Sequence, residues 1–310
     1  MKRLQNKIAG SRKALPVTIV VCTAIWLTAG VMQHQWWIQF GCFLLSVAVM
    51  TELDNNNALI RTYSRMVTAS YALLSCLPCF LFPSTGGSIF QLCLVASLFT
   101  LFRCYQDKQA AGWAFHTFLI LGMASMASVL TFWLLPVVWL LMATTLYCLS
   151  WRTFVASLLG LLCPYWFVLA WILCFCEADM TPLLEHLEQA GHYKLPADYL
   201  SLSLSQVLTF GLMTILSITG ILHYIRNYYY DKIRTREIYY SMMILWVVAT
   251  LLLIIQPQHD DIMLRVIVTV GSPLIGHFIA LTSTKLTNIA FCVIVSAVVL
   301  LTAFNLWMAS

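Results

Sequence analysis

Apolar runs long enough to cross a lipid bilayer follow one another along almost the whole chain. Of its 310 residues, 61% are apolar and 9% are charged. A soluble domain carries about 25% charged residues, so this chain cannot cover a globule with a water-compatible surface. The sequence predicts an all-α, polytopic integral membrane protein. It argues against a nucleic-acid partner, a soluble Rossmann-type enzyme and a secreted disulfide scaffold.

The apolar runs divide into eleven candidate membrane spans within a single transmembrane domain, residues 1–310. A helix needs roughly 20 mainly apolar residues to cross the hydrocarbon. The second span is short, and the fifth and sixth almost adjoin. In order, the spans are 15–31, 36–51, 64–83, 87–104, 113–131, 132–149, 154–176, 201–223, 239–256, 264–282 and 286–307.

The positions of the charges predict the orientation of these spans. Lys and Arg are retained on the cytoplasmic side of a membrane. With the N-terminus inside, 15 of the 17 basic residues fall in cytoplasmic segments, and only Lys194 and Arg265 fall outside. The sequence therefore predicts a multi-pass membrane protein with a cytoplasmic N-terminus and an external C-terminus.

The larger outer loop, 177–200, predicts a short amphipathic helix. Thr181 is a candidate cap with Pro182 in the first turn, and Leu183, Leu184 and Leu187 follow at helical spacing. Two interpretations stay open. The helix is a passive re-entry segment on the membrane surface, or it is a lid over an outward-facing site.

The larger inner loop, 224–238, is rich in tyrosine and basic residues, including Tyr228, Tyr229, Tyr230, Lys232, Arg234 and Arg236. Each basic residue near anionic lipid contributes about 1 kcal/mol of attraction. We expect a headgroup belt that sets the topology, with a docking site for lipid phosphate or a cytoplasmic protein as the alternative. Another inner polar run, Glu52 to Asn57, is expected to form a loop because its asparagines favour turns.

Ionisable side chains deep in a membrane are functional candidates by default, and this sequence predicts very few. His277 is the one titratable residue expected at depth. It is a candidate substrate-binding residue, or a neutral histidine that bonds a backbone carbonyl. Proton-coupled transport needs acidic relays, so the pattern disfavours it.

The densest outer polar cluster comprises His259, Asp260, Asp261 and Arg265. Asp260 and Asp261 are candidate catalytic residues, as a base or as metal ligands, and His259 and Arg265 are candidate substrate-binding residues, with Arg265 on a phosphate. In the structural alternative, both aspartates favour a helix start and Arg265 pairs with one of them. No metal site and no cofactor are expected.

Basic, glycine and proline residues recur at intervals along residues 59–175. They are found at Arg61, Arg65, Pro83, Gly122, Leu134-Leu135-Pro136, Arg152 and Gly160 to Tyr165. This pattern resembles the hairpin series of GT-C-type membrane glycosyltransferases. The resemblance implies transfer from a polyprenyl-phosphate-linked sugar. Those enzymes carry an essential acidic residue in the first outer loop, whereas here that loop is Gln33-His34-Gln35-Trp36-Trp37. Catalysis would then move to Asp260 and Asp261, or to Glu177 and Asp179.

The same stretch, together with Gly271-Ser272-Pro273, His277, Lys285 and Asn305-Leu306-Trp307, resembles a family of uncharacterised multipass inner-membrane proteins of Bacteroidetes bacteria. That resemblance implies a location in the bacterial inner (cytoplasmic) membrane and no activity.

Three functional hypotheses follow from the sequence. We expect first a non-enzymatic scaffold or accessory subunit in cell-envelope assembly, since the loops are small and buried charge is scarce. The second is the GT-C-like transferase. The third is an envelope-lipid transporter or flippase, which a groove lined by Trp133, Trp139, Trp166 and Trp171 would favour. The expected partners are membrane lipids, with a polyprenyl-phosphate lipid or an envelope protein.

Overall fold

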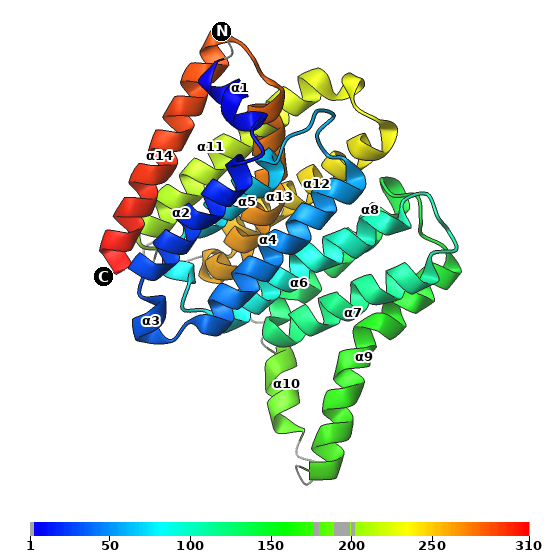
Figure 1. Cartoon of the computed structure of the whole chain (residues 1–310). Helices are drawn as coiled ribbons and strands as arrows, with labels where there is room; N and C mark the ends of the chain where they lie inside the picture. The colour runs from blue at the N-terminus through cyan, green and yellow to red at the C-terminus, as the bar shows by residue number, and fades with distance from the viewer. Residues whose placement is uncertain (1–2, 176–179, 189–198, 200–201, 310) are drawn as a thin grey trace.

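The computed structural model describes residues 3–175, 180–188, 199 and 202–309 of the chain. Every regular element within these residues is helical (Figure 1). In chain order the α-helices are α1 (Leu4–Ala9), α2 (Ala14–Thr28), α3 (Val31–His34), α4 (Trp37–Asn57), α5 (Met66–Cys76), α6 (Thr85–Leu101), α7 (Ala111–Ala127), α8 (Leu135–Thr144), α9 (Trp151–Phe175), α10 (Thr181–Glu188), α11 (Leu204–Asn227), α12 (Ile233–Ile255), α13 (Asp260–Leu281) and α14 (Lys285–Ala309).

In the described residues, seven helical segments are long and apolar enough to cross a membrane. They are Trp37–Asn57, Thr85–Cys104, Trp151–Phe175, Leu204–Tyr230, Ile233–Ile255, Pro257–Leu281 and Lys285–Met308. Shorter apolar helices cover the other four predicted spans: Ala14–Thr28, Met66–Cys76, Ala111–Ala127 and Val129–Thr144. The all-helical, membrane-protein class is therefore confirmed. Seven of the eleven predicted spans thus contain a helix of spanning length, and the count of eleven and the orientation of the chain ends stay predictions.

Local breaks explain why some predicted spans are short. The third predicted span, 64–83, ends as α-helix at Cys76, and Pro78 separates it from a 3₁₀ turn, Cys79–Leu81. The fifth span ends at Ala127 because Ser128 is extended, with a ψ of 114°. A 3₁₀ turn, Val129–Trp133, then leads into α8. Pro164 and Pro273, in contrast, lie inside continuous helices.

The inner polar run Glu52 to Asn57 is helical, so the loop expected there was wrong. The Nδ2 atoms of Asn56 and Asn57 donate to the carbonyl oxygens of Glu52 and Leu53, 2.8 and 2.9 Å away. These bonds reach back one turn and keep the asparagines compatible with α4. The helix ends where Ala58 adopts a left-handed φ of 47°.

The basic, tyrosine-rich stretch 224–238 is also mostly helical rather than a loop. Helix α11 continues to Asn227, a 3₁₀ turn covers Tyr228–Tyr230, and α12 begins at Ile233. Tyr228, Tyr229 and Tyr230 are exposed, whereas Tyr224 and Tyr239 are fully buried. Only part of the stretch can therefore act as a headgroup belt.

Helix α13 is the centre of the bundle. It packs against α5, α6, α11 and α12, and its whole apolar window is buried. Glycines permit this close packing: a Cβ on Gly276 would lie 2.8 Å from Val67 Cα of α5, and one on Gly220 of α11 would lie 2.8 Å from the Leu274 carbonyl carbon.

The segments predicted to be cytoplasmic gather at one end of the bundle, which we call the basic end. It comprises residues 3–13, 57–65, 102–110, 146–150, 228–236 and 282–285. Hydrogen bonds join these segments: Ser64 Oγ to Ala9 O, Arg234 Nη2 to Asn57 Oδ1 and Phe102 O, Gln106 N to Leu146 O, Ser150 Oγ to Lys108 O, and Gln5 Nε2 to Thr282 Oγ1.

The predicted outer segments meet one another at the far end of the bundle. Gln39 Nε2 donates to Thr85 Oγ1, Ser84 Oγ to Asp261 Oδ2, Gln206 Nε2 to Asp260 Oδ2, and Asn305 Nδ2 to Leu77 O. The two chain ends lie apart (Figure 1). Gln5 N donates to Asn288 Oδ1 near the start of α14. Ala309, the last described residue, lies at the other end of that 25-residue helix, about 37 Å away.

Helix α9 forms an arm at the edge of the bundle, and α10 lies beside it (Figure 1). Its first half packs closely on α7, because a Cβ on Gly160 would overlap the Phe115 carbonyl oxygen. After Pro164, Ile172 is the one buried residue in the described part of α9.

Candidate functional site

Arg265 and Asp261 occupy the first turns of α13 and bond to each other. Arg265 Nε donates to Asp261 Oδ1 at 2.7 Å, and the Arg265 side chain is 6% exposed. The spacing of four residues places both on one face of the helix. This is the pairing that the structural alternative predicted for the cluster.

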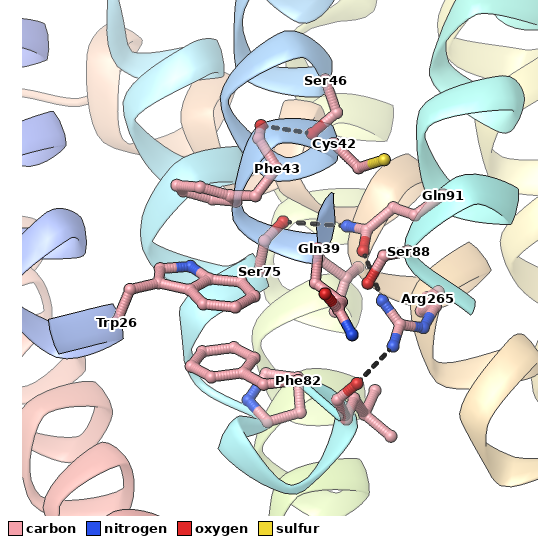
Figure 2. A pocket seen from close by; sticks show the side chains of 13 residues that line it. Trp26, Gln39, Cys42, Phe43, Ser46, Ser75, Phe82, Ser88, Gln91 and Arg265 are labelled. Carbon is pink, nitrogen blue, oxygen red and sulfur yellow. Dashed lines mark hydrogen bonds between the residues drawn. The ribbon is translucent and has the colours of Figure 1, made fainter. Parts of the chain in front are cut away.

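The remaining Arg265 nitrogens bond to neighbouring elements (Figure 2). Nη1 donates to Gln91 Oε1 of α6 at 3.1 Å, and Nη2 donates to the Leu81 carbonyl at 2.6 Å. The Leu81 carbonyl belongs to the break after α5. The same carbonyl also accepts from the Ser84 backbone nitrogen at 3.2 Å. Arg265 is therefore its second donor, and the bond ties α13 to the break after α5.

The second carboxylate oxygen of Asp261 is also bonded. Ser84 Oγ donates to Asp261 Oδ2 at 2.7 Å and accepts from Gly87 N at 3.1 Å, which caps the start of α6. A Cβ at Gly87 would lie 2.6 Å from Arg265 Nε, so glycine is required there. Asp261, Arg265 and Ser84 together form a closed set of bonds between α13 and α6.

Asp260 faces a different helix from Asp261. Gln206 Nε2 of α11 donates to Asp260 Oδ2 at 2.6 Å. Gln206 Oε1 accepts from the Ser203 backbone and hydroxyl in a capping box at the start of α11. The structure therefore separates the two proposed catalytic carboxylates instead of pairing them.

The cavity beside Arg265 is small and has both polar and apolar walls. Gln39, Ser75, Ser88 and Gln91 line it, with Trp26 and Phe82 stacked at one side, as Figure 2 shows. Its volume of about 20 Å³ suits one ordered water. It has no room for a sugar or a lipid headgroup.

Asp260 lines a separate and larger cavity. That space, about 270 Å³, lies between α11, α12 and α13 and is walled mainly by apolar side chains such as Val207, Phe210 and Leu253. His259 lies outside both cavities and packs edge-on against Trp133, with 5.8 Å between ring centroids. Glu177 and Asp179, the alternative acids, lie outside the described residues.

His277 does not join the Asp261–Arg265 cluster, because it follows Arg265 by twelve residues, about 18 Å along the helix. It is completely buried near the basic end. Its Nε2 lies 3.1 Å from Asp231 Oδ2, and Asp231 is itself buried. The partner of His277 is therefore a carboxylate, not the backbone carbonyl expected from sequence.

Asp231 is a functional candidate that sequence reasoning missed. It stands between Tyr230 and Lys232 in a stretch interpreted as a headgroup belt. Its other oxygen, Oδ1, lies 4.0 Å from Arg61 Nη1. An acid within a basic, aromatic run was the available signal, but its burial depends on how α11 and α12 pack together.

Tyrosines and a second histidine enclose the His277–Asp231 pair. The rings of Tyr224 and Tyr239 lie 5.1 Å from that of His277, and the ring of His223 lies 5.6 Å away. Four buried polar atoms in this cluster have no hydrogen-bond partner: His277 Nδ1, Asp231 Oδ1, Tyr224 Oη and His223 Nε2. Such atoms are normally satisfied by ordered water or a ligand.

An apolar groove of about 610 Å³ separates α9 from α10. Leu161, Trp166 and Phe167 of α9 line one wall, and Leu183 and Leu187 of α10 line the other. His186 Nε2 lies 2.9 Å from the Ser125 carbonyl and holds α10 against α7. Leu184, the third leucine of the predicted apolar face, is exposed.

The groove only partly matches the one expected of a lipid transporter. Of the four tryptophans, Trp166 alone lines it. Trp139 packs on Phe118 and donates to Ser157 Oγ, and Trp171 packs on Phe175.

Comparison with protein-family models, curated proteins and solved structures finds no match. The two resemblances noted in the sequence therefore stay predictions.

Proposed function

We propose that the chain is a non-enzymatic, multi-pass protein of a bacterial inner membrane that acts as a scaffold or accessory subunit in cell-envelope assembly. The observation that carries the proposal is the arm formed by α9 and α10. This arm presents an apolar surface that nothing in the described chain covers.

The arm has the chemistry of a site for a partner transmembrane helix. Trp166, Phe167, Trp171 and Phe175 are between 60% and 70% exposed. Aromatic residues dominate the energetics of protein interfaces, and the adjoining groove offers a concave apolar surface. The proposed partner is therefore an apolar helix of another envelope protein, packed along the second half of α9.

Eleven membrane segments with a cytoplasmic N-terminus belong to the same proposal. Its support is the alternation of connections between the basic end and the far end, along with the separation of the chain ends by the length of α14. An odd number of crossings places the two termini on opposite sides. The positive-inside rule then assigns the basic end to the cytoplasm.

Co-purification from native membranes tests the scaffold. The comparison is between the wild-type protein and the combined variant Trp166→Ala, Phe167→Ala and Trp171→Ala, both purified in mild detergent and weighed by native mass spectrometry. The control is Leu286→Ala, Val299→Ala and Leu300→Ala on α14, which removes equally exposed apolar side chains. We expect a partner protein to be retained by the wild type and the control and lost from the α9 variant. Retention by all three, or by none, contradicts the proposal.

A second candidate, an envelope-lipid transporter or flippase, is favoured by the same groove. Its volume is in the range of small-molecule sites, and its walls are almost entirely apolar. A lipid that co-purifies with the wild type and the control but not with the α9 variant, with no protein partner, would favour this function.

We do not propose the polyprenyl-phosphate sugar transferase. Asp261 and Arg265 are bonded to each other and to α6, and Asp260 faces α11. These residues offer neither a paired carboxylate nor a free guanidinium for a sugar phosphate.

A further inference from the structure

We propose that His277 and Asp231 form a proton-binding site inside the bundle, close to the basic end. This inference goes beyond the proposed scaffold role. It rests on the unusual position of the pair: a histidine and a carboxylate, both buried, on and beside the central helix of a chain with very little buried charge.

The electrostatic argument begins with Asp231. A carboxylate removed from water is costly unless opposite charge or hydrogen bonds compensate it. Arg61 is 4.0 Å away, is 36% exposed and packs over the Tyr230 ring, so it compensates Asp231 only in part. A proton on His277 would place a second positive charge 3.1 Å from the carboxylate. A proton on His277 would therefore stabilise the buried Asp231 carboxylate.

The polar atoms around the pair have hydrogen-bonding capacity to spare for an internal water. His277 Nδ1 and Asp231 Oδ1 are acceptors without donors, and Tyr224 Oη is a donor without an acceptor. An internal water with two to four polar partners satisfies such a set. Chains of histidine, carboxylate and water are the means by which membrane proteins move protons.

Few other charges face His277 from the elements packed around it. Helix α11 contributes His223 and Tyr224, and α12 contributes Tyr239. The α5 segment opposite Gly276 presents backbone of Met66 and Val67. Asp231 is thus the charged group closest to the imidazole, and Arg61 is the cation that competes with it.

Histidine-selective nitrogen NMR tests the site in the full-length protein in detergent. Spectra of the ¹⁵N-histidine-labelled chain are recorded from pH 5 to pH 9, and His277→Gln identifies the His277 signals. We expect the His277 ring to pass from the neutral to the doubly protonated form within this range. In Asp231→Asn, the ratio of protonated to neutral His277 at a given pH should fall about tenfold or more, because the stabilising charge is gone.

Asp260→Asn is the matched control. It removes a carboxylate from the same helix about 25 Å away, and the ratio at His277 should not change. Arg61→Gln is the second variant, in case Asp231→Asn does not fold. It removes the competing cation while keeping the pair, so the ratio should rise. A His277 ring that stays neutral down to pH 5, or a ratio unaffected by Asp231→Asn or by Arg61→Gln, overturns the proposal.

Discussion

Arg265 of the central helix donates a hydrogen bond to the backbone carbonyl of Leu81, with 2.6 Å between Nη2 and the oxygen. The contact joins α13 to the point where α5 ends early. Together with Asp261, Gln91 and Ser84, it shows how the bundle tolerates a break in a helix at membrane depth. The buried arginine is a second donor to the Leu81 carbonyl, which also accepts from the Ser84 backbone nitrogen at 3.2 Å, and it ties the central helix to the break.

Removing this arginine should destabilise the fold strongly. Arg265→Met leaves the Asp261 carboxylate without its cation and removes one of the two donors to the Leu81 carbonyl. We expect the free energy of unfolding to fall by about 3 kcal/mol, as for other buried pairs that lose one partner. Denaturant titration in detergent measures the loss. Arg12→Met, at an exposed position, is the control and should change the free energy of unfolding by less than about 0.5 kcal/mol. Equal losses of stability in the two variants would contradict a structural role for Arg265.

The two adjacent aspartates should respond differently to the same substitution. Asp261→Asn removes the counter-ion of a buried arginine, and the expected cost is again about 3 kcal/mol. Asp260→Asn keeps an oxygen for Gln206 and loses mainly its interaction with the helix start, which is worth at most about 1 kcal/mol. The same denaturant titration compares them. A larger loss at Asp260 would be incompatible with the assigned contacts.

The arm depends on the contact of α9 with α7 at Gly160. Gly160→Ala forces a methyl group onto the Phe115 carbonyl, and overpacking of this kind costs about 1–3 kcal/mol. The matched control is Gly211→Ala in α11, where no atom lies within 4 Å of the added Cβ. The control should be neutral or gain up to about 1 kcal/mol from helix propensity. Thermal unfolding of both variants in detergent decides whether α9 is seated as described.

The order of the helices was largely predictable, whereas their lengths and the candidate site were not. Each of the eleven apolar runs contains a helix, because run length reflects the thickness of the hydrocarbon. The short helices arise at Pro78 and Ser128, where local geometry ends a run that hydropathy alone continues. Asn56 and Asn57 were predicted to lie in a loop because asparagine favours turns. Their side-chain hydrogen bonds to carbonyl oxygens four residues earlier cannot be read from the sequence.

The depth of the polar residues required the three-dimensional packing. The cluster of Asp260, Asp261 and Arg265 was visible, and the pairing of Arg265 with Asp261 followed from helical spacing. The contacts with Ser84, Gln91 and Gln206 did not, because they join helices distant in sequence. His277 was identified, but its partner Asp231 was not. Spans that are apolar all round carry no periodic signal to show which faces meet.

The orientation of the chain ends is open to a direct test. With eleven segments, a reporter active only outside the cytoplasm should work when fused after Ser310 and fail when fused before Met1. A cytoplasmic fluorescent reporter should give the reverse pattern. Both termini on one side of the membrane would contradict the odd number of crossings inferred from the position of α14.

The scaffold role depends most directly on what lies against α9 in the native membrane, and site-specific photo-crosslinking measures this. A photoreactive amino acid in place of Phe167 on the arm is compared with one in place of Leu300 on α14, since the two side chains are equally accessible, at 69% and 70%. The account predicts a discrete protein crosslink from position 167 and none from position 300. Crosslinks to lipid alone from both positions would contradict it.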